Sequence, residues 1–190
     1  MPKSVREGRI TREAVIAEDE IDVFLSLYRE AFRIMEELSP LRQSMTDEEF
    51  RDEMRNPAVI KLVGWDTSGS PAAILCTTND ISCIPWLNPK YYQKMYPSQF
   101  AAGSLFWVGT ILVHPFRKGQ HHVSGLIREN VLLVTEGAED GICLFDCCEY
   151  NATEIKLPEL VEAVSREVDP SISCEQIDTQ RFYAIRRVAS

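Results

Sequence analysis

The chain has 190 residues, of which 45% are hydrophobic and 26% are charged, with only 9 glycines and 10 prolines. This composition is typical of a globular domain and excludes disordered, fibrous and collagen-like proteins. Because 20 basic residues stand against 29 acidic ones, the net charge is −9, which repels phosphate backbones and anionic lipids, so we expect neither a nucleic acid nor a membrane as a partner.

The cysteines and the apolar runs predict a cytoplasmic location. The six cysteines lie mostly inside apolar stretches, and the adjacent pair Cys147 and Cys148 is unusual for the disulfide framework of a secreted protein. Residues 1–15 lack the apolar stretch of a signal peptide, and nowhere do about 18 apolar residues follow one another. We therefore expect free thiols and no transmembrane segment.

Two helices are predicted in the N-terminal part of the chain. Apolar residues recur at helical spacing from Ile21 to Met35, which places them on one face of a helix. Thr46 and Glu49 then form the pattern of a capping box and predict a second, short helix that ends at Asn56-Pro57.

A hairpin and an aromatic segment follow. Residues 58–65 and 72–77 are apolar and flank a polar turn, which predicts two antiparallel strands. Residues 85–100 fit no strand and predict an insertion or lid. Trp86 and Tyr92 from this segment, with Trp107, are candidates for an acceptor pocket, although the same aromatic side chains would also close a core over an insertion.

The second half of the chain predicts a crossover between parallel strands. Residues 105–113 form an apolar strand, a helical stripe runs from Val123 to Val134, and residues 142–145 form a continuous apolar strand. A helix over 158–168 and a last strand over 182–188 complete the chain. The sequence thus predicts one mixed α/β domain over residues 1–190.

This order of elements, together with the segment VHPFRKGQHHV at residues 113–123, resembles the GNAT family of acetyl-CoA-dependent N-acetyltransferases. The layout covers residues 11–188, and the match of individual residues is concentrated between 105 and 134. The resemblance implies a central, mostly antiparallel sheet flanked by helices. It also implies direct transfer of an acetyl group from acetyl-CoA to a primary amine of a small molecule or a protein, and a possible homodimer.

The loop before the third predicted helix is the expected site of the coenzyme pyrophosphate. Unpaired N–H groups and the helix dipole favour an anion at a helix N-terminus, whereas a solvated basic turn is the alternative. The family loop reads Q/R-x-x-G-x-G/A; here Lys118 stands at the Arg or Gln position, and His121 and Val123 replace the two small residues. The resemblance assigns coenzyme contacts to Leu112, Val113, Arg117, Lys118, Gly119, Gln120, His121, His122, Val123 and Asn151.

The catalytic groups are encoded less clearly. The strand over 105–113 contains no carboxylate, so Asp146 and Glu149, near the end of the next strand, are the candidate general bases. The family often places a tyrosine on the following helix to protonate the leaving thiolate; residues 152–168 contain none, and Tyr150 is the candidate replacement.

Four other interpretations compete with this function. A thiol nucleophile at Cys147 or Cys148 is disfavoured, because it needs an electropositive and partly exposed setting, whereas Cys143 and Cys147 alternate with Phe145 along one face of an apparent core strand. The three histidines lack metal-ligand spacing, so we expect no metal. A catalytically inactive GNAT-like protein that binds a ligand or a partner, and a longer-chain N-acyltransferase, stay open as alternatives.

Overall fold

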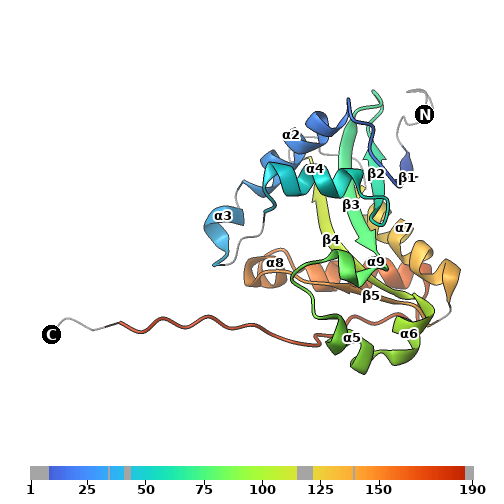
Figure 1. The fold of residues 1–190 in the computed structure, drawn as a ribbon, viewed down its shortest axis with the longest axis vertical. Helices are drawn as coiled ribbons and strands as arrows, with labels where there is room; N and C mark the ends of the chain where they lie inside the picture. The colour runs from blue at the N-terminus through green and yellow to red at the C-terminus, as the bar shows by residue number, and fades with distance from the viewer. Residues whose placement is uncertain (1–8, 34, 41–43, 115–121, 139, 187–190) are drawn as a thin grey trace.

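A five-stranded mixed sheet forms the centre of the computed structural model, which describes residues 9–186 except residues 34, 41–43, 115–121 and 139 (Figure 1). The strand order is β1-β2-β3-β4-β5, and every neighbouring pair is antiparallel except β4 and β5, which are parallel. The strands are β1 (Ile10–Glu13), β2 (Ile60–Trp65), β3 (Pro71–Thr78), β4 (Leu105–Val113) and β5 (Ile142–Phe145). The predicted fold class, a mostly antiparallel sheet flanked by helices, is confirmed.

Helices cover both faces of this sheet (Figure 1). One face packs against α2 (Ile21–Phe32) and α4 (Asp47–Arg55), with the short α3 (Met35–Leu38) between them, and the opposite face packs against α7 (His122–Gly137). Helix α9 (Leu157–Val168) packs on α7. Within the described residues, no helix combines the length and the hydrophobicity needed to cross a membrane.

Successive side chains of a strand point to opposite faces of the sheet, and this alternation explains why helices pack on both faces. Val63 of β2, Ile74 of β3 and Leu112 of β4 point toward α2 and α4, where they meet Phe24 and Phe50. Their sequence neighbours in the strands point the other way and contact Leu126 of α7. This division into two apolar faces is what a sheet covered on both sides requires.

The connection between β3 and β4 carries the predicted insertion. It contains the 3₁₀ turn η1 (Ile81–Cys83) and the helices α5 (Pro89–Met95) and α6 (Pro97–Ala102). Tyr92, Tyr96 and Phe100 from this segment pack against a cluster that includes Leu105 and Trp107 of β4. The aromatic side chains therefore close a part of the core, as the second reading of this segment proposed.

The predicted elements are found where the hydrophobic pattern was strong. The capping box, the hairpin and the crossover from β4 through α7 to β5 are all confirmed. Strand β1 and the short helix α8 (Glu149–Thr153) were missed, because each is too short to show a period.

The last predicted strand is wrong over its described part. Residues 182–186 lie in no strand and extend away from the body of the protein (Figure 1). Their composition favours a strand, but a strand needs a partner to pair with. None of the described strands pairs with these residues, and residues 187–188 lie outside the described part of the chain.

The capping box of α4 offers a direct test of the local structure. The Thr46 hydroxyl accepts a hydrogen bond from the Glu49 N–H (3.3 Å), and the Glu49 carboxylate accepts one from the Thr46 N–H (2.7 Å). Thr46→Ala removes the first bond and should lower the free energy of unfolding by about 1 kcal/mol, measured by urea denaturation. Thr46→Ser keeps the hydroxyl and should retain most of the stability; equal losses in both variants would contradict this role.

Candidate active site

The parallel strands β4 and β5 separate in the middle of β4. Their pairing ends where Val108 faces Phe145, but β4 continues to Val113. Asp146 and Gly109 are therefore the first residues beyond the paired region. From Gly109 onward, no described strand pairs with β4 on this side, so the backbone polar groups of that edge are open to a ligand.

A β-bulge lies at the same point. Cys76 of β3 pairs with Thr110, whereas Thr77 pairs with Val108, so Gly109 is the extra residue in β4. A bulge of this kind redirects the side chains next to it. Here it brings Trp107 and Thr110 to the same face of the sheet, the one that α4 covers.

Glu53 of α4 reaches this bulge. Its Oε1 accepts a hydrogen bond from the Thr110 hydroxyl (3.4 Å), and its Oε2 lies 4.0 Å from the point that a Cβ on Gly109 would occupy. The Cys76 thiol also donates a hydrogen bond to this carboxylate. The carboxylate thus lies at the opening between β4 and β5.

A row of polar residues crosses the sheet beneath Glu53. Lys61 of β2 pairs with Cys76 of β3, which pairs with Thr110 of β4. The Lys61 side chain is fully buried, and its Nζ donates hydrogen bonds to the carbonyl oxygens of Ala14 (2.9 Å) and Asn56 (2.6 Å). These bonds satisfy two of the three donors of the amine.

Burial dominates the electrostatics of this row. It raises the pKa of the Glu53 carboxyl, although the Cys76 hydrogen bond and the Lys61 charge act in the opposite direction. Burial likewise lowers the pKa of Lys61 and raises that of Cys76 well above its ordinary value. A carboxylate whose pKa is raised takes up a proton more readily near neutral pH, as a general base must.

Trp107 places a second polar group next to Gly109. Its side chain is 5% exposed, and no described residue accepts a bond from its Nε1 atom, which lies 3.9 Å from the Gly109 Cβ position. Tyr92 of α5 packs edge-on against the Trp107 ring, with a centroid separation of 6.4 Å. Buried donors are rarely left unpaired, so this N–H is available to donate to an ordered water or to an acceptor atom of a ligand.

The predicted catalytic residues lie at or just after the opening. Asp146 follows β5 directly, and desolvation raises its pKa. Glu149, Tyr150 and Asn151 form the first turn of α8, with Cys148 as its N-cap residue.

The predicted coenzyme residues are only partly described. Arg117, Lys118, Gly119, Gln120 and His121 lie outside the described residues, and of His122 only its place as the first residue of α7 is described. Leu112 is buried in the core, and Val113 and Val123 are half-buried.

The structure places only two of the three predicted substrate residues beside the opening. Trp107 and Tyr92 are in contact beside the opening, whereas Trp86 is 61% exposed and belongs to no described core cluster. The thiol alternative loses support, because burial raises the pKa of Cys147 and raises that of Cys143 to about 11. A nucleophilic cysteine requires the opposite shift.

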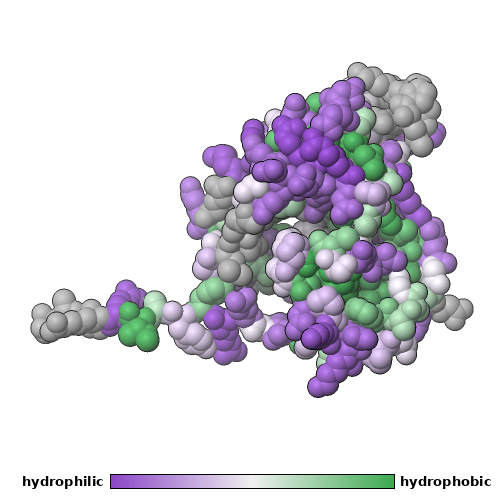
Figure 2. All heavy atoms as spheres, viewed as in Figure 1, coloured by the Kyte–Doolittle hydropathy of each residue, from purple (hydrophilic) through white to green (hydrophobic). Residues whose placement is uncertain are grey.

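Glu53 and Gly109 were missed by the sequence reasoning. Glu53 stands among the acidic residues of α4, a pattern typical of a solvated helix, and Figure 2 shows hydrophilic atoms over this helix. Its position three residues after the buried Phe50 and one before the buried Met54 was the available signal, since it places Glu53 beside the core-facing stripe.

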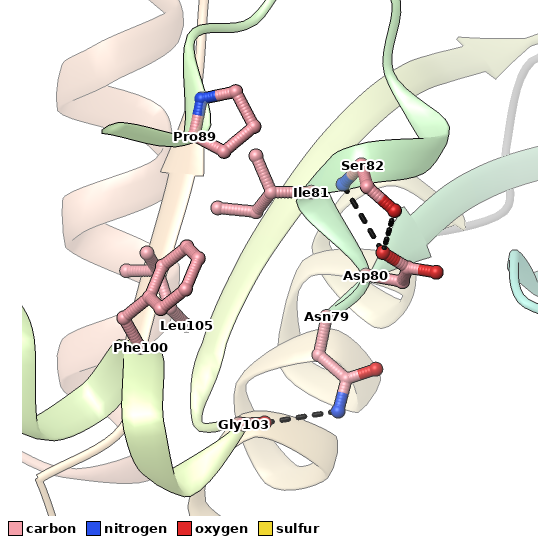
Figure 3. A pocket seen from close by; sticks show the side chains of 8 residues that line it. All are labelled: Asn79, Asp80, Ile81, Ser82, Pro89, Phe100, Gly103 and Leu105. Atoms are coloured by element: carbon pink, nitrogen blue, oxygen red, sulfur yellow. Dashed lines mark hydrogen bonds between the residues drawn. The ribbon is translucent and has the colours of Figure 1, made fainter. Parts of the chain in front are cut away.

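A separate pocket of about 220 Å³ lies where β3 ends and β4 begins (Figure 3). Its polar groups are already paired: Asn79 Nδ2 donates to the Gly103 carbonyl (2.9 Å), and the Asp80 carboxylate accepts from the Ser82 N–H (3.1 Å). We therefore assign no ligand to it. The pocket is lined by Asn79, Asp80, Ile81, Ser82, Pro89, Phe100, Gly103 and Leu105.

No protein-family model matches the sequence, and no curated protein matches it at a significant level. Solved structures of GNAT-type acetyltransferases do resemble the fold. An aminoglycoside acetyltransferase from an uncultured soil metagenomic sample, in complex with sisomicin, is 15% identical with a TM-score of 0.48, and the alignment covers 94% of this chain and 96% of that one.

Two structures from Brucella melitensis are similar as well. A ribosomal-protein-alanine N-acetyltransferase from biovar Abortus 2308 is 13% identical, with a TM-score of 0.49 and coverage of 94% of this chain and 99% of the other. A GNAT family acetyltransferase in complex with acetyl-CoA is 17% identical, with a TM-score of 0.43 and coverage of 76% and 81%. Because each TM-score is below 0.5, these likenesses carry no inference about chemistry.

The raised pKa of Glu53 predicts a pH-dependent cost to stability. The folded protein retains this proton at pH values where the unfolded chain, with an ordinary pKa of 4.5, has lost it. The resulting stabilisation is present below the unfolded value and is lost as the pH rises through the folded one. Glu53→Gln should therefore gain stability relative to the wild type as the pH increases from about 4 to about 7.

Urea denaturation at a series of pH values measures this difference. Glu48→Gln, on the exposed side of the same helix, controls for the loss of one negative charge from α4. A stability difference between Glu53→Gln and the wild type that does not change with pH would show that this carboxyl is not desolvated.

Proposed function

We propose that this protein transfers an acetyl group from acetyl-CoA to a primary amine of a small molecule or a protein. The observation that carries the proposal is the opening between β4 and β5, where the Glu53 carboxylate and the Trp107 indole nitrogen both lie about 4 Å from the point that a Cβ on Gly109 would occupy, at 4.0 Å and 3.9 Å. The glycine leaves the space between these two groups free of a side chain. Such a site offers a base, a donor and an open strand edge to two substrates that must be aligned.

The coenzyme would lie along the open edge of β4. The resemblance to the GNAT family assigns the pantetheine arm to the backbone at Leu112 and Val113, and these residues are on the edge that β5 leaves unpaired. The pyrophosphate would then reach the segment before α7, whose predicted ligands include Arg117 and Lys118. The acyl end would lie near Gly109.

Glu53 would act as the general base. It accepts a proton from the acceptor amine as the amine nitrogen attacks the thioester carbonyl, the C–N bond forms, and the C–S bond then breaks. The leaving thiolate takes up a proton, for which Tyr150 on α8 stays the candidate donor. The products are an amide and free coenzyme A. This assignment replaces Asp146 and Glu149 as first choice, because Glu53 is the carboxylate in contact with the bulge.

The acceptor class follows from the charges around the opening. Glu53, Asp146 and Glu149 are all acidic, and the whole chain carries a net charge of −9, which favours a cationic amine over a neutral or anionic one. Tyr92 and Trp107 add an aromatic wall, which suits a cation or a planar group.

Coenzyme binding is the first measurement. Acetyl-CoA at about 100 times its dissociation constant should stabilise the native state by about 2.7 kcal/mol, which is a rise of roughly 5–10 °C in the melting temperature. Lys118→Glu should remove most of this rise, whereas Lys94→Glu on α5 makes the same charge change at another exposed lysine and should keep it. If no acyl-CoA raises the melting temperature, the protein is not an acyltransferase.

The role of Glu53 is tested by kinetics with a panel of amines. Glu53→Gln should lower kcat by about 10²–10⁴-fold while the dissociation constant of acetyl-CoA stays unchanged. Asp146→Asn provides the comparison at the first carboxylate after β5. A full loss in Asp146→Asn with normal activity in Glu53→Gln would move the base to Asp146, and coenzyme binding without turnover of any amine would favour the catalytically inactive alternative.

A further inference from the structure

The opening beside Gly109 is bounded by one polar and one largely apolar side chain. Leaving out the glycine's chain neighbours, the atoms nearest to the point that a Cβ on Gly109 would occupy are Trp107 Cδ1 and Nε1, both at 3.9 Å, and Glu53 Oε2 at 4.0 Å. A hydrocarbon chain placed against the carboxylate would remove water from a charge without replacing its hydrogen bonds, which is unfavourable. A chain that extends from this point is therefore favoured on the Trp107 side.

The Trp107 ring is held on that side by side chains from three elements. Leu144 of β5 faces Trp107 across the strand pair, and Leu105 of β4 belongs to the same apolar cluster. Tyr92 of α5 packs edge-on against the indole, and only 5% of Trp107 is exposed. Because side chains in such an environment are closely packed, the ring has little room to move aside. It closes the opening in this direction.

An unfilled space lies further along the same face of β4. The pocket of about 220 Å³ has Ile81, Phe100 and Leu105 in its wall, and these three residues belong to the same apolar cluster as Trp107. Side chains two residues apart in a strand point to the same face and lie roughly 7 Å from one another. The order along β4 is therefore the pocket at Leu105, then the indole of Trp107, then the opening at Gly109.

One half of this pocket suits a hydrocarbon chain. Figure 3 shows the apolar side chains of the wall gathered on one side, and the hydrogen-bonded Asn79, Asp80 and Ser82 on the other. An apolar cavity of about 150 Å³ is large enough to bind benzene, which has six carbon atoms. The pocket here, at about 220 Å³, could accordingly take a chain of about six carbons if it were reached from Gly109.

We infer that the side chain of Trp107 determines the length of the acyl group, because it separates the opening at Gly109 from this pocket and so restricts the donor to a short chain. The inference rests on the proposed acyl transfer and selects acetyl over the longer chains. The reaction itself is the same for either donor. The C–N bond forms as the C–S bond breaks, the amine proton passes to Glu53, and the thiolate of coenzyme A takes up a proton.

Transfer rates with acetyl-CoA and hexanoyl-CoA, measured with the same amine, test this role. For the wild type, kcat/KM should be at least about 100-fold lower with hexanoyl-CoA than with acetyl-CoA. Trp107→Ala opens a path to the pocket and should raise the hexanoyl-to-acetyl ratio of kcat/KM by more than about 100-fold. The dissociation constant provides a readout that needs no turnover: Trp107→Ala should bind hexanoyl-CoA more than about tenfold tighter than acetyl-CoA.

Three further variants separate the size of the side chain from its other properties. Trp107→Leu keeps part of the apolar contact, so it should fold more readily than the alanine variant, and it should shift the ratio in the same direction. Trp107→Phe removes the N–H but keeps an aromatic ring, and it should retain the short-chain limit. Trp65→Leu removes a buried indole that packs against Phe24 and is 1% exposed; it controls for lost stability and should leave the ratio unchanged.

Filling the pocket shows whether the acyl chain enters it. Leu105→Phe places a larger side chain in the pocket wall. Combined with Trp107→Ala, it should abolish the gain in hexanoyl transfer, whereas a general loosening of the fold would be unaffected by this second substitution.

The possible results distinguish this inference from the proposed function. A wild type that transfers hexanoyl and acetyl groups equally well, a folded Trp107→Ala variant with the wild-type ratio, or a gain that survives Leu105→Phe would each overturn the role of Trp107 while acetyl transfer itself stands. A wild type that binds neither coenzyme ester would overturn the proposed function, and this inference with it.

Discussion

The unequal length of two parallel strands determines most of what is distinctive in this protein. Strand β4 pairs with β3 along nearly its whole length, whereas β5 pairs with it only as far as Val108. A longer β5 would close the edge of β4 and leave no place for an extended ligand. Because β5 stops at this point, the second half of β4 is held by β3 on one side and has an unpaired edge on the other. A functional site benefits from such a rigid support.

Helix α4 holds the Glu53 carboxyl at this opening at a thermodynamic cost. Its acidic first turn and its capping box favour the helix, and Phe50 and Met54 anchor it to the sheet. Glu53, between these two anchors in the sequence, is thereby held in an environment that opposes its charge. The hydrogen bond from Cys76, the charge of Lys61 and the hydrogen bond from Thr110 offset only part of this opposition, and a carboxylate kept in such a setting is a frequent property of functional sites.

The sequence predicts those elements whose apolar periodicity is long enough to be distinctive. The bounds of β4 and β5 follow from continuous apolar runs, and α4 follows from Thr46 and Glu49. The site could not be predicted in the same way, because it depends on a one-residue slip between β3 and β4 and on the packing of α4 across the sheet. At the C-terminus the sequence predicts a strand that the structure does not contain. Residues 182–186 have strand composition, but pairing depends on a partner strand that composition does not reveal.

Chemical labelling of the buried Lys61 amine can report how often the helices above it separate from the sheet. Lys90 and Lys94 lie on the surface and would react with an amine-specific reagent in the native state, whereas Lys61 is inaccessible. Its two carbonyl partners, Ala14 and Asn56, belong to the segments that flank α2 and α4. The rate at which Lys61 is labelled therefore measures how often these helices lift from the sheet, and it gives the local free energy of that motion at the residue level.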